Sequence, residues 1–370
     1  MSKTRMVLCA AAFLLGIVQT SQARGSGRAG ASFYQICNDS FSRWDRNRDG
    51  FLSMAEVNAL VEDPRVRDAE AAALVTLRWR LIQADEQNQP RGMSREQVLS
   101  FAGEHRAKRG FATVLGQIGS INRALYLPGG PSLLAIHQGA LGDCYLLAVI
   151  GALVNRNPQA VQEMIHPQPE GGYLVHFPTG KTVSVKPLTG AELVMLPGMN
   201  SDHGIWIAVL EKAYAEMRED NHDGQTGATA TPSDSVPRDW LRGGRGPPTI
   251  EQWTGHKAER MLLYREYQGN PRKLMEALDP LLIKLTAERR LIAAGKGDHL
   301  FAVLDYNPKH QILRLFNPHG ETSTPAGPPG PVNGYITRHG VFEIPLRDFV
   351  QLFHTLSWET DEPLAPEKHS

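Results

Sequence analysis

One cysteine in the sequence occupies a position that suits nucleophilic chemistry. Cys144 follows Gly142 and Asp143 and precedes an apolar run from Tyr145 to Ile150. The pattern predicts a helix that starts at this cysteine, with Gly142 or Asp143 as its cap. Unpaired N–H groups and the positive end of the helix dipole favour a thiolate there. The alternative is a capping turn with a buried, inert cysteine, and local features alone do not decide between the two.

A glutamine upstream of this cysteine could assist acyl transfer. Gln138 lies in a Gly-containing turn before the predicted helix. Its side-chain amide and the backbone N–H of Cys144 could together stabilise the oxyanion that forms when a thiolate attacks a carbonyl. A nucleophilic cysteine also needs a general base, and that base needs an orienting partner.

A predicted β-hairpin narrows the choice of base among 13 histidines. Two segments around Asn307-Pro308-Lys309-His310 alternate polar and apolar residues. If the turn is centred in this tetrapeptide, His299 faces Pro318 and lies beside Asn317 at the open end. A carboxamide oxygen that accepts from one ring nitrogen leaves the other facing the sulfur. Cysteine, histidine and asparagine then follow the chain order of papain-like proteases.

A second set of side chains has the spacing of calcium ligands. Residues 45–56, DRNRDGFLSMAE, resemble an EF-hand loop, in which Gly50 provides the sharp turn. Calcium requires several oxygens around one point, and six loop positions can supply them, with position seven giving a backbone carbonyl. The predicted calcium ligands are Asp45, Asn47, Asp49, Phe51, Ser53 and Glu56.

A related but altered segment follows at residues 85–96, DEQNQPRGMSRE. It keeps Asp85 and Glu96 at the first and twelfth positions, but glutamines fill the third and fifth, and Pro90 replaces the glycine. We expect a degenerate EF-hand that pairs with the first one and binds calcium weakly or not at all.

The beginning of the chain predicts export. Residues 1–23 carry Lys3 and Arg5, then an apolar stretch from Met6 to Val18, then a small-residue exit, as in a secretory signal peptide. We therefore expect a secreted or periplasmic protein. No later segment approaches the ~20 apolar residues that a membrane span requires.

Composition restricts the function classes and the cysteine chemistry. The 370 residues include 39 basic and 39 acidic side chains, so no global field would attract nucleic acid. With Cys9 inside the predicted signal, Cys37 and Cys144 are too few for a disulfide framework. Cys37 lies on an apolar stripe of helical spacing, so we expect it to be buried and inert, and a Cys37–Cys144 bridge is the alternative.

Four parts of the sequence resemble the calpain family of cysteine proteases. They are QGALGDCYLLAVIGAL at 138–153, GIWIAVLEKAYAE at 204–216, GDHLFAVLDY with LRLFNPHG at 297–320, and FEIPLRDFVQLF at 342–353. The resemblance implies that Cys144 is the nucleophile, His299 the base, Asn317 the orienting residue and Gln138 the oxyanion donor. Tyr145 and His319 stand where calpains usually have tryptophan.

The same resemblance implies an α+β fold: a papain-like two-lobed cysteine protease core preceded by an all-α EF-hand domain. The expected division is a linker at 24–32, an EF-hand pair at 33–105, a lobe with the cysteine at 115–245, and a lobe with histidine and asparagine at 246–360. Residues 221–248 read as a long loop that ends in a hinge.

The predicted function is that of a calcium-binding cysteine endopeptidase acting on protein or peptide substrates. Two alternatives stay open at this level. One is a calpain-like calcium-binding interaction protein without activity, and the other is a thiol enzyme that transfers acyl groups to amines as transglutaminases do.

Overall fold

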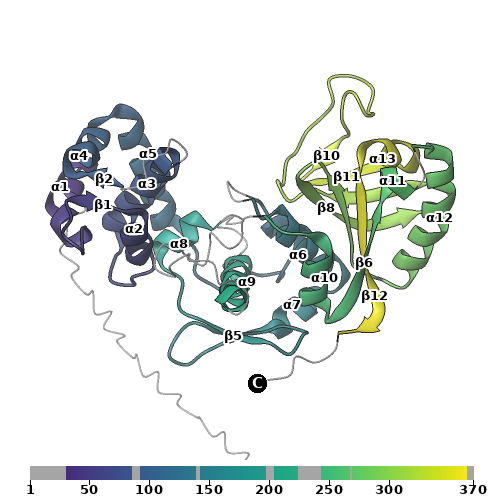
Figure 1. Ribbon diagram of the computed structural model, residues 1–370, viewed down its shortest axis with the longest axis horizontal. Coiled ribbons are helices and arrows are strands. Elements are labelled where there is room, and N and C mark those ends of the chain that lie inside the picture. The colour runs from purple at the N-terminus through teal and green to yellow at the C-terminus, as the bar shows by residue number, and fades with distance from the viewer. Residues whose placement is uncertain are drawn as a thin grey trace, which may run out of the picture.

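The computed structural model describes residues 31–85, 92–138, 142–196, 204–223, 243–266 and 269–364. A helix-rich N-terminal unit lies at one end and a seven-stranded sheet at the other, with several helices between them (Figure 1). The predicted signal peptide, most of the linker and the centre of the second calcium-type loop lie outside the described residues. Among the described residues, no helix combines the length and the hydropathy needed to cross a bilayer.

The N-terminal unit is built from helices and one short strand pair. Its elements are α1 (Phe33–Trp44), β1 (Phe51–Leu52), α2 (Met54–Val61), α3 (Asp68–Asp85), β2 (Met93–Ser94), α4 (Arg95–Gly103) and α5 (His105–Ser120). β1 and β2 pair antiparallel, with Leu52 opposite Met93, and join the first calcium-type loop to the second.

Apolar burial explains where the helices of this unit lie. The stripe expected on α1 is buried, and Cys37 within it has no exposed surface. Ser32 and Gln35 form a capping box that starts the helix. Phe111 and Val114 of α5 pack into the same core, so the helical unit continues beyond residue 105, where the sequence placed its end.

The middle of the molecule consists of helices and a small sheet. Its elements are η1 (Leu133–Ala135), α6 (Cys144–Arg156), α7 (Pro158–Met164), β3 (Ile165–Pro167), β4 (Tyr173–His176), β5 (Thr182–Val185), α8 (Gly190–Met195), α9 (Trp206–Asp223) and α10 (Gly246–Thr254). Residues 144–154 of α6 are all buried, which suits a helix that is apolar on every side.

The seven-stranded antiparallel sheet has the order β10-β11-β9-β8-β7-β12-β6. Its strands and the helices along it are β6 (His256–Leu262), α11 (Leu263–Glu266), α12 (Pro271–Ala287), β7 (Ile292–Lys296), β8 (His299–Asn307), β9 (Ile312–Phe316), β10 (Thr337–Arg338), β11 (Val341–Pro345), α13 (Leu346–Leu352) and β12 (Thr355–Pro363).

The sheet is covered on both faces. Gly151 of α6 lies so close to the Phe316 ring that a Cβ atom at this position would come within 2.8 Å of it. This glycine therefore lets α6 approach the sheet. The other face packs against α12 and α13 through residues such as Leu278, Leu315 and Phe349.

The hairpin of β8 and β9 forms, but its turn differs from the expected one. Asn307 pairs with Ile312, so the turn is centred one residue later than predicted. A β-bulge between Val303 and Asp305 then shifts the register before Ala302 pairs with Phe316. Continuing this register brings His319, rather than Pro318, opposite His299, and the two imidazole centroids are 4.6 Å apart.

Helix α8 connects the N-terminal unit with the rest of the molecule. Ala191 and Met195 on α8 belong to the core of the helical unit, whereas Leu193 packs into the core around α6. The hydroxyl of Thr189, which caps α8, donates to the carbonyl of Val61 at the end of α2 at 2.6 Å. The helical unit is thus packed against the core.

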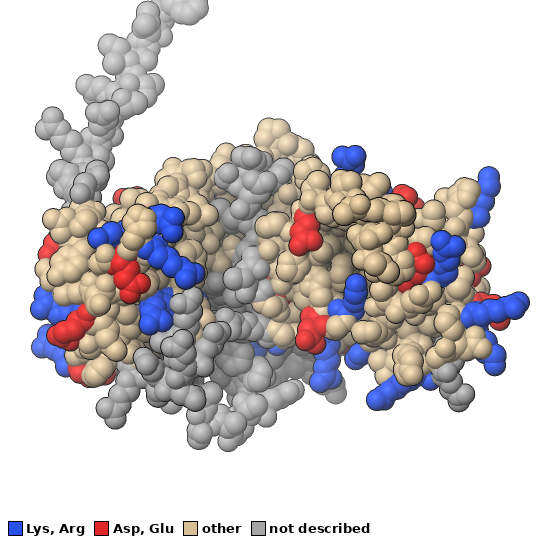
Figure 2. Space-filling view, turned by 90° about the horizontal axis from the view of Figure 1, so that it is seen from above, with Lys and Arg blue, Asp and Glu red and all other residues tan. Residues whose placement is uncertain are grey.

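Charge is distributed over the molecule without a dominant sign. Figure 2 shows Lys and Arg side chains at both ends of the visible face, with Asp and Glu side chains interspersed among them. This distribution agrees with the equal numbers of basic and acidic residues.

Candidate active site

Cys144 is the first residue of α6, as the sequence predicts. Asp143 is the residue at the N-cap, but its side chain makes no capping hydrogen bond. The thiol is 7% exposed, and its Sγ lies 3.7 Å from the carbonyl oxygen of Asp298, on the segment that leads into β8. Helix α6 thus brings the sulfur next to a loop more than a hundred residues away in the sequence.

Burial raises the pKa of the Cys144 thiol, and this is the opposite of what the helix terminus alone suggests. Backbone N–H groups, that of Leu300 first and then those of Tyr145 and Cys144, act in the other direction, while the Asp143 carboxylate adds to the upward shift. The desolvation cost of a thiolate exceeds the stabilisation from these dipoles. The cysteine is therefore a neutral thiol at pH 7 in this state of the protein.

His299 opens β8 and is held by Asn317. Its Nε2 lies 2.7 Å from Asn317 Oδ1, so Nε2 donates and Nδ1 stays available as an acceptor. The same Oδ1 accepts from the backbone N–H of His319 at 3.1 Å, and the backbone N–H of Asn317 donates to Gly340 at 2.8 Å. Asn317 is therefore held through its side-chain oxygen and through its backbone N–H.

Burial lowers the pKa of His299. The hydrogen bond that its ring donates to Asn317 raises the pKa, and the neighbouring His319 lowers it further. Because burial dominates, the imidazole is neutral at pH 7. A neutral imidazole can take a proton, which is what a general base requires.

Cys144 and His299 line one cavity of about 430 Å³. Its other walls come from residues 243–246, from residues 295–298 and from the start of β12. Gln138 is buried, and its backbone N–H donates to the carbonyl of Pro318 at 2.6 Å, next to Asn317. Of the four side chains named from the sequence, Cys144 and His299 line the cavity, Asn317 is bonded to His299, and Gln138 is linked to the residue after Asn317 through its backbone.

Residues 243–246 form a wall of this cavity that the sequence did not reveal. The backbone N–H of Gly243 donates to the carbonyl of Gly142 at 3.0 Å, just before α6. A Cβ atom at Gly244 would lie 2.3 Å from the Tyr145 ring, so only glycine allows this approach. The segment that read as the end of a hinge is therefore in contact with α6. The adjacent glycines were the signal, because a Gly pair often marks close backbone contact.

Arg218 is a second residue that the sequence did not single out. From α9 its guanidinium donates to the hydroxyl of Tyr145 and to the carbonyl of Gly243, the latter at 3.2 Å. The guanidinium carbon lies 5.7 Å from the centre of the Tyr145 ring, within the range of a cation–π contact. Arg218 thus connects the residue after the cysteine with the cavity wall.

The first calcium-type loop is folded around its acidic side chains. Asp45 Oδ2 accepts from the backbone N–H of Gly50 at 3.0 Å, and Gly50 has a φ of +85°. Glu56 reaches back to the loop, where it accepts from the backbone N–H groups of Arg46 at 2.7 Å and Ser53 at 2.9 Å. Asp49 accepts from the backbone N–H of Phe51 at 2.8 Å.

The donor types in this loop fit a hard cation. Within the described part of the chain, no group of three or more His, Cys, Asp and Glu side chains is arranged as a metal site. The predicted calcium set includes three such side chains, Asp45, Asp49 and Glu56, and here they accept backbone N–H groups of the loop instead of forming a group of that kind. An amide, a hydroxyl and a backbone oxygen complete the predicted set. In the second loop, Glu96 accepts from the Ser94 hydroxyl at 2.9 Å, while residues 86–91 lie outside the description.

A thiol, an imidazole and a carboxamide are the three groups that thiol-dependent acyl-transfer sites combine. Residues 116–235 match the family model described as calpain family cysteine protease. The matched segment contains Gln138 and Cys144 and ends before His299. The match supports a calpain-type cysteine protease core and, with it, a cysteine-type peptidase.

Proposed function

We propose that this protein is a calpain-like cysteine endopeptidase with Cys144 as nucleophile and His299 as base. One observation carries the proposal: the thiol and the imidazole line the same cavity, and the imidazole is held by Asn317 at 2.7 Å. The Cys37–Cys144 bridge considered from the sequence is absent, since both cysteines are free. The thiol is therefore available for chemistry.

The proposed reaction starts from a neutral pair. As Cys144 Sγ attacks the peptide carbonyl, its proton passes to Nδ1 of His299, and the N–H of Cys144 and the amide of Gln138 stabilise the oxyanion. The intermediate collapses to a thioester, and His299 returns the proton to the leaving amine. His299 then takes a proton from water, which attacks the thioester and releases a carboxylic acid and the thiol.

Casein hydrolysis tests this proposal. We expect the protein to cleave casein and Cys144→Ala to be inactive, with Cys37→Ala as the matched control. Mass spectrometry after treatment with a peptide electrophile should place the label on Cys144. Neither cleavage nor labelling at neutral pH with calcium present would instead support the inactive interaction protein, which the raised pKa of Cys144 and His319 in place of tryptophan favour.

Hydrolysis must also be distinguished from transfer to amines. A labelled primary amine added to the casein assay should stay free if water is the acceptor. Incorporation of the label into casein, without new peptide termini, would support the transglutaminase-like alternative.

We further propose that residues 45–56 bind calcium as an EF-hand and that residues 33–105 contain an EF-hand pair. The folded loop, the left-handed Gly50 and the pairing of β1 with β2 support this. The expected result is a rise in melting temperature with calcium, lost in Glu56→Gln and kept in the matched Glu96→Gln. Equal responses of the two variants would contradict the proposal.

We also propose that the protease core divides at residue 245 into a lobe with the cysteine and a lobe with histidine and asparagine.

We propose in addition that the protein is exported and that residues 1–23 are removed. N-terminal sequencing of the protein recovered outside the cytoplasm tests the export proposal, with a mature terminus near Arg24 as the expected result.

A further inference from the structure

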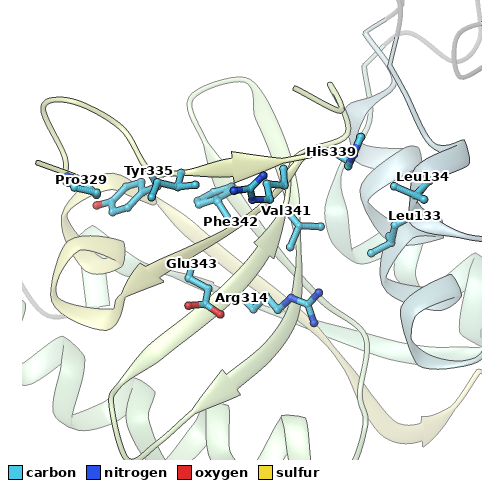
Figure 3. A pocket seen from close by; sticks show the side chains of 11 residues that line it. Leu133, Leu134, Arg314, Pro329, Tyr335, His339, Val341, Phe342 and Glu343 are labelled. Atoms are coloured by element: carbon cyan, nitrogen blue, oxygen red, sulfur yellow. The ribbon is translucent and has the colours of Figure 1, made fainter. Parts of the chain in front are cut away.

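A second cavity, of about 690 Å³, lies along the strands on the other side of β8 from the cavity with Cys144 (Figure 3). It is formed by segments that are far apart in the sequence. η1 contributes leucines from one side, the loop before β10 contributes Pro329 and Tyr335 from the other, and β9 and β11 form the base. The residues that line this cavity include Leu133, Leu134, Arg314, Arg338, Val341 and Glu343.

The two cavities are lined from different strands of one sheet, and His299 lines the one with Cys144. The cavity with Cys144 is lined from β7, β8 and β12, whereas the second cavity is lined from β9, β11 and β10. One hydrogen bond and one short stretch of chain connect the second cavity to the candidate active site. The backbone N–H of Asn317 donates to Gly340, beside Val341, and Leu134 lies four residues before Gln138.

The strand spacing sets the length of peptide that would reach from one cavity to the other. From β8 to β11 there are two spacings, or roughly 10 Å, and an extended chain advances about 3.3 Å per residue. A substrate bound at Cys144 would thus present its third residue beyond the scissile bond to the second cavity.

The direction of the substrate follows from the acid–base roles. His299 must face the leaving amine, because it returns a proton to that nitrogen. The path from the sulfur through the imidazole to Asn317 leads toward Gly340 and the second cavity. The part of the substrate that follows the scissile bond is therefore the part that enters it.

The chemistry of the second cavity favours an acidic residue beside an apolar one. Leu134 and Ile336 are each 51% exposed, which is unusual for such side chains and leaves apolar surface available. Arg314 and Arg338 have no carboxylate within ion-pair distance among the described residues, although Glu343 is the cross-strand neighbour of Arg314. The lining thus holds two guanidinium groups and one carboxylate.

We propose that this cavity is a specificity site for substrates with an acidic side chain at the third position after the scissile bond. Arg314 and Arg338 supply the cationic contacts, and Leu133, Leu134 and Val341 supply the apolar surface. The inference rests on the proposed protease function for the direction of the peptide. Its charge preference can be measured by binding alone.

The test uses the full chain with Cys144→Ala, so that binding is measured without cleavage. Two fluorescent peptides differ only in Glu or Gln at the third position after the intended scissile bond. Fluorescence anisotropy at low salt should give an affinity about three- to ten-fold higher for the Glu peptide, and 0.5 M salt should reduce the difference.

Variants assign the preference to the cavity. Arg314→Ala with Arg338→Ala should remove the preference, Glu343→Gln should increase it, and Arg272→Ala on the exposed surface of α12 should preserve it. Equal affinities for both peptides, no measurable binding, or a preference that survives the double arginine variant would overturn the inference. Binding with the expected preference but no cleavage by the unsubstituted protein would refute the protease function and leave the charge selectivity standing.

Discussion

The core of the N-terminal helical unit and the cavity at the start of α6 each hold a buried, free cysteine. Around Cys37 the only cause of a pKa shift is burial among apolar side chains, which raises its pKa to about 12. Around Cys144 burial also dominates, but several backbone N–H groups oppose it, and a neutral imidazole lines the same cavity. Both thiols are thus buried, but of the two only Cys144 has backbone N–H donors and an imidazole in its surroundings. On the proposed function, this difference separates a reactive thiol from an inert one.

The largest expected effect comes from removing the sulfur of Cys144, and removal of the Cys37 sulfur is the matched comparison. Cys144→Ala should lower kcat/KM for casein by about 10⁴-fold or more, because the covalent route is lost. Cys37→Ala removes only apolar packing and should leave kcat/KM within about two-fold. A comparable loss of kcat/KM in both variants would show that the two cysteines do not differ in their role. Melting curves of both proteins check that the folds are intact.

Alkylation compares the two thiols in the same molecule. Iodoacetamide should modify Cys144 at least about a hundred-fold faster than Cys37, because reagent reaches Cys37 only when the helical core opens. Since the pKa of Cys144 is raised, its rate should still increase above pH 9.0 rather than level off near neutrality. Peptide mapping at each pH measures both rates. A plateau near pH 7 would show that an ion pair with His299 exists before substrate binds.

The role of Asn317 can be measured as a shift in pH dependence. The acid limb of kcat/KM should lie below pH 6.5, because burial lowers the pKa of His299. Asn317 raises this pKa, so Asn317→Ala should move the limb to still lower pH and reduce kcat/KM by about ten- to a hundred-fold. A limb that moves to higher pH would show that the carboxamide does not stabilise the imidazolium.

The smallest effect is expected at Arg218, which touches the cavity wall but not the thiol. Arg218→Met should raise KM by about three- to ten-fold with little change in kcat, because the wall at Gly243 loses a hydrogen bond while the thiol and imidazole stay in place. Tyr145→Phe removes the other acceptor and should cause a smaller increase. A fall in kcat alone would instead place Arg218 in the positioning of the thiol.

Much of this molecule is encoded locally. The spacing in residues 45–56 comes from consecutive residues, and a loop of that length can fold only within a narrow range of shapes. The start of α6 at Cys144 and the hairpin of β8 and β9 also follow from short-range patterns. Because hydrogen bonds within helices and hairpins connect near neighbours, such elements can be predicted without knowledge of the fold.

Other features depend on tertiary packing. The helix terminus favours a thiolate, and the sequence left a buried, inert cysteine as the alternative; the pKa of Cys144 depends on how deeply α6 is buried. The wall at Gly243 and its contact with Arg218 join α9 to a segment that read as a hinge, and the second cavity needs η1 beside β11. Desolvation and contacts between distant segments depend on how the elements pack against one another. The residue types able to do chemistry were thus determined by the sequence, whereas their protonation and the shape of the surrounding cavities were decided by the tertiary structure.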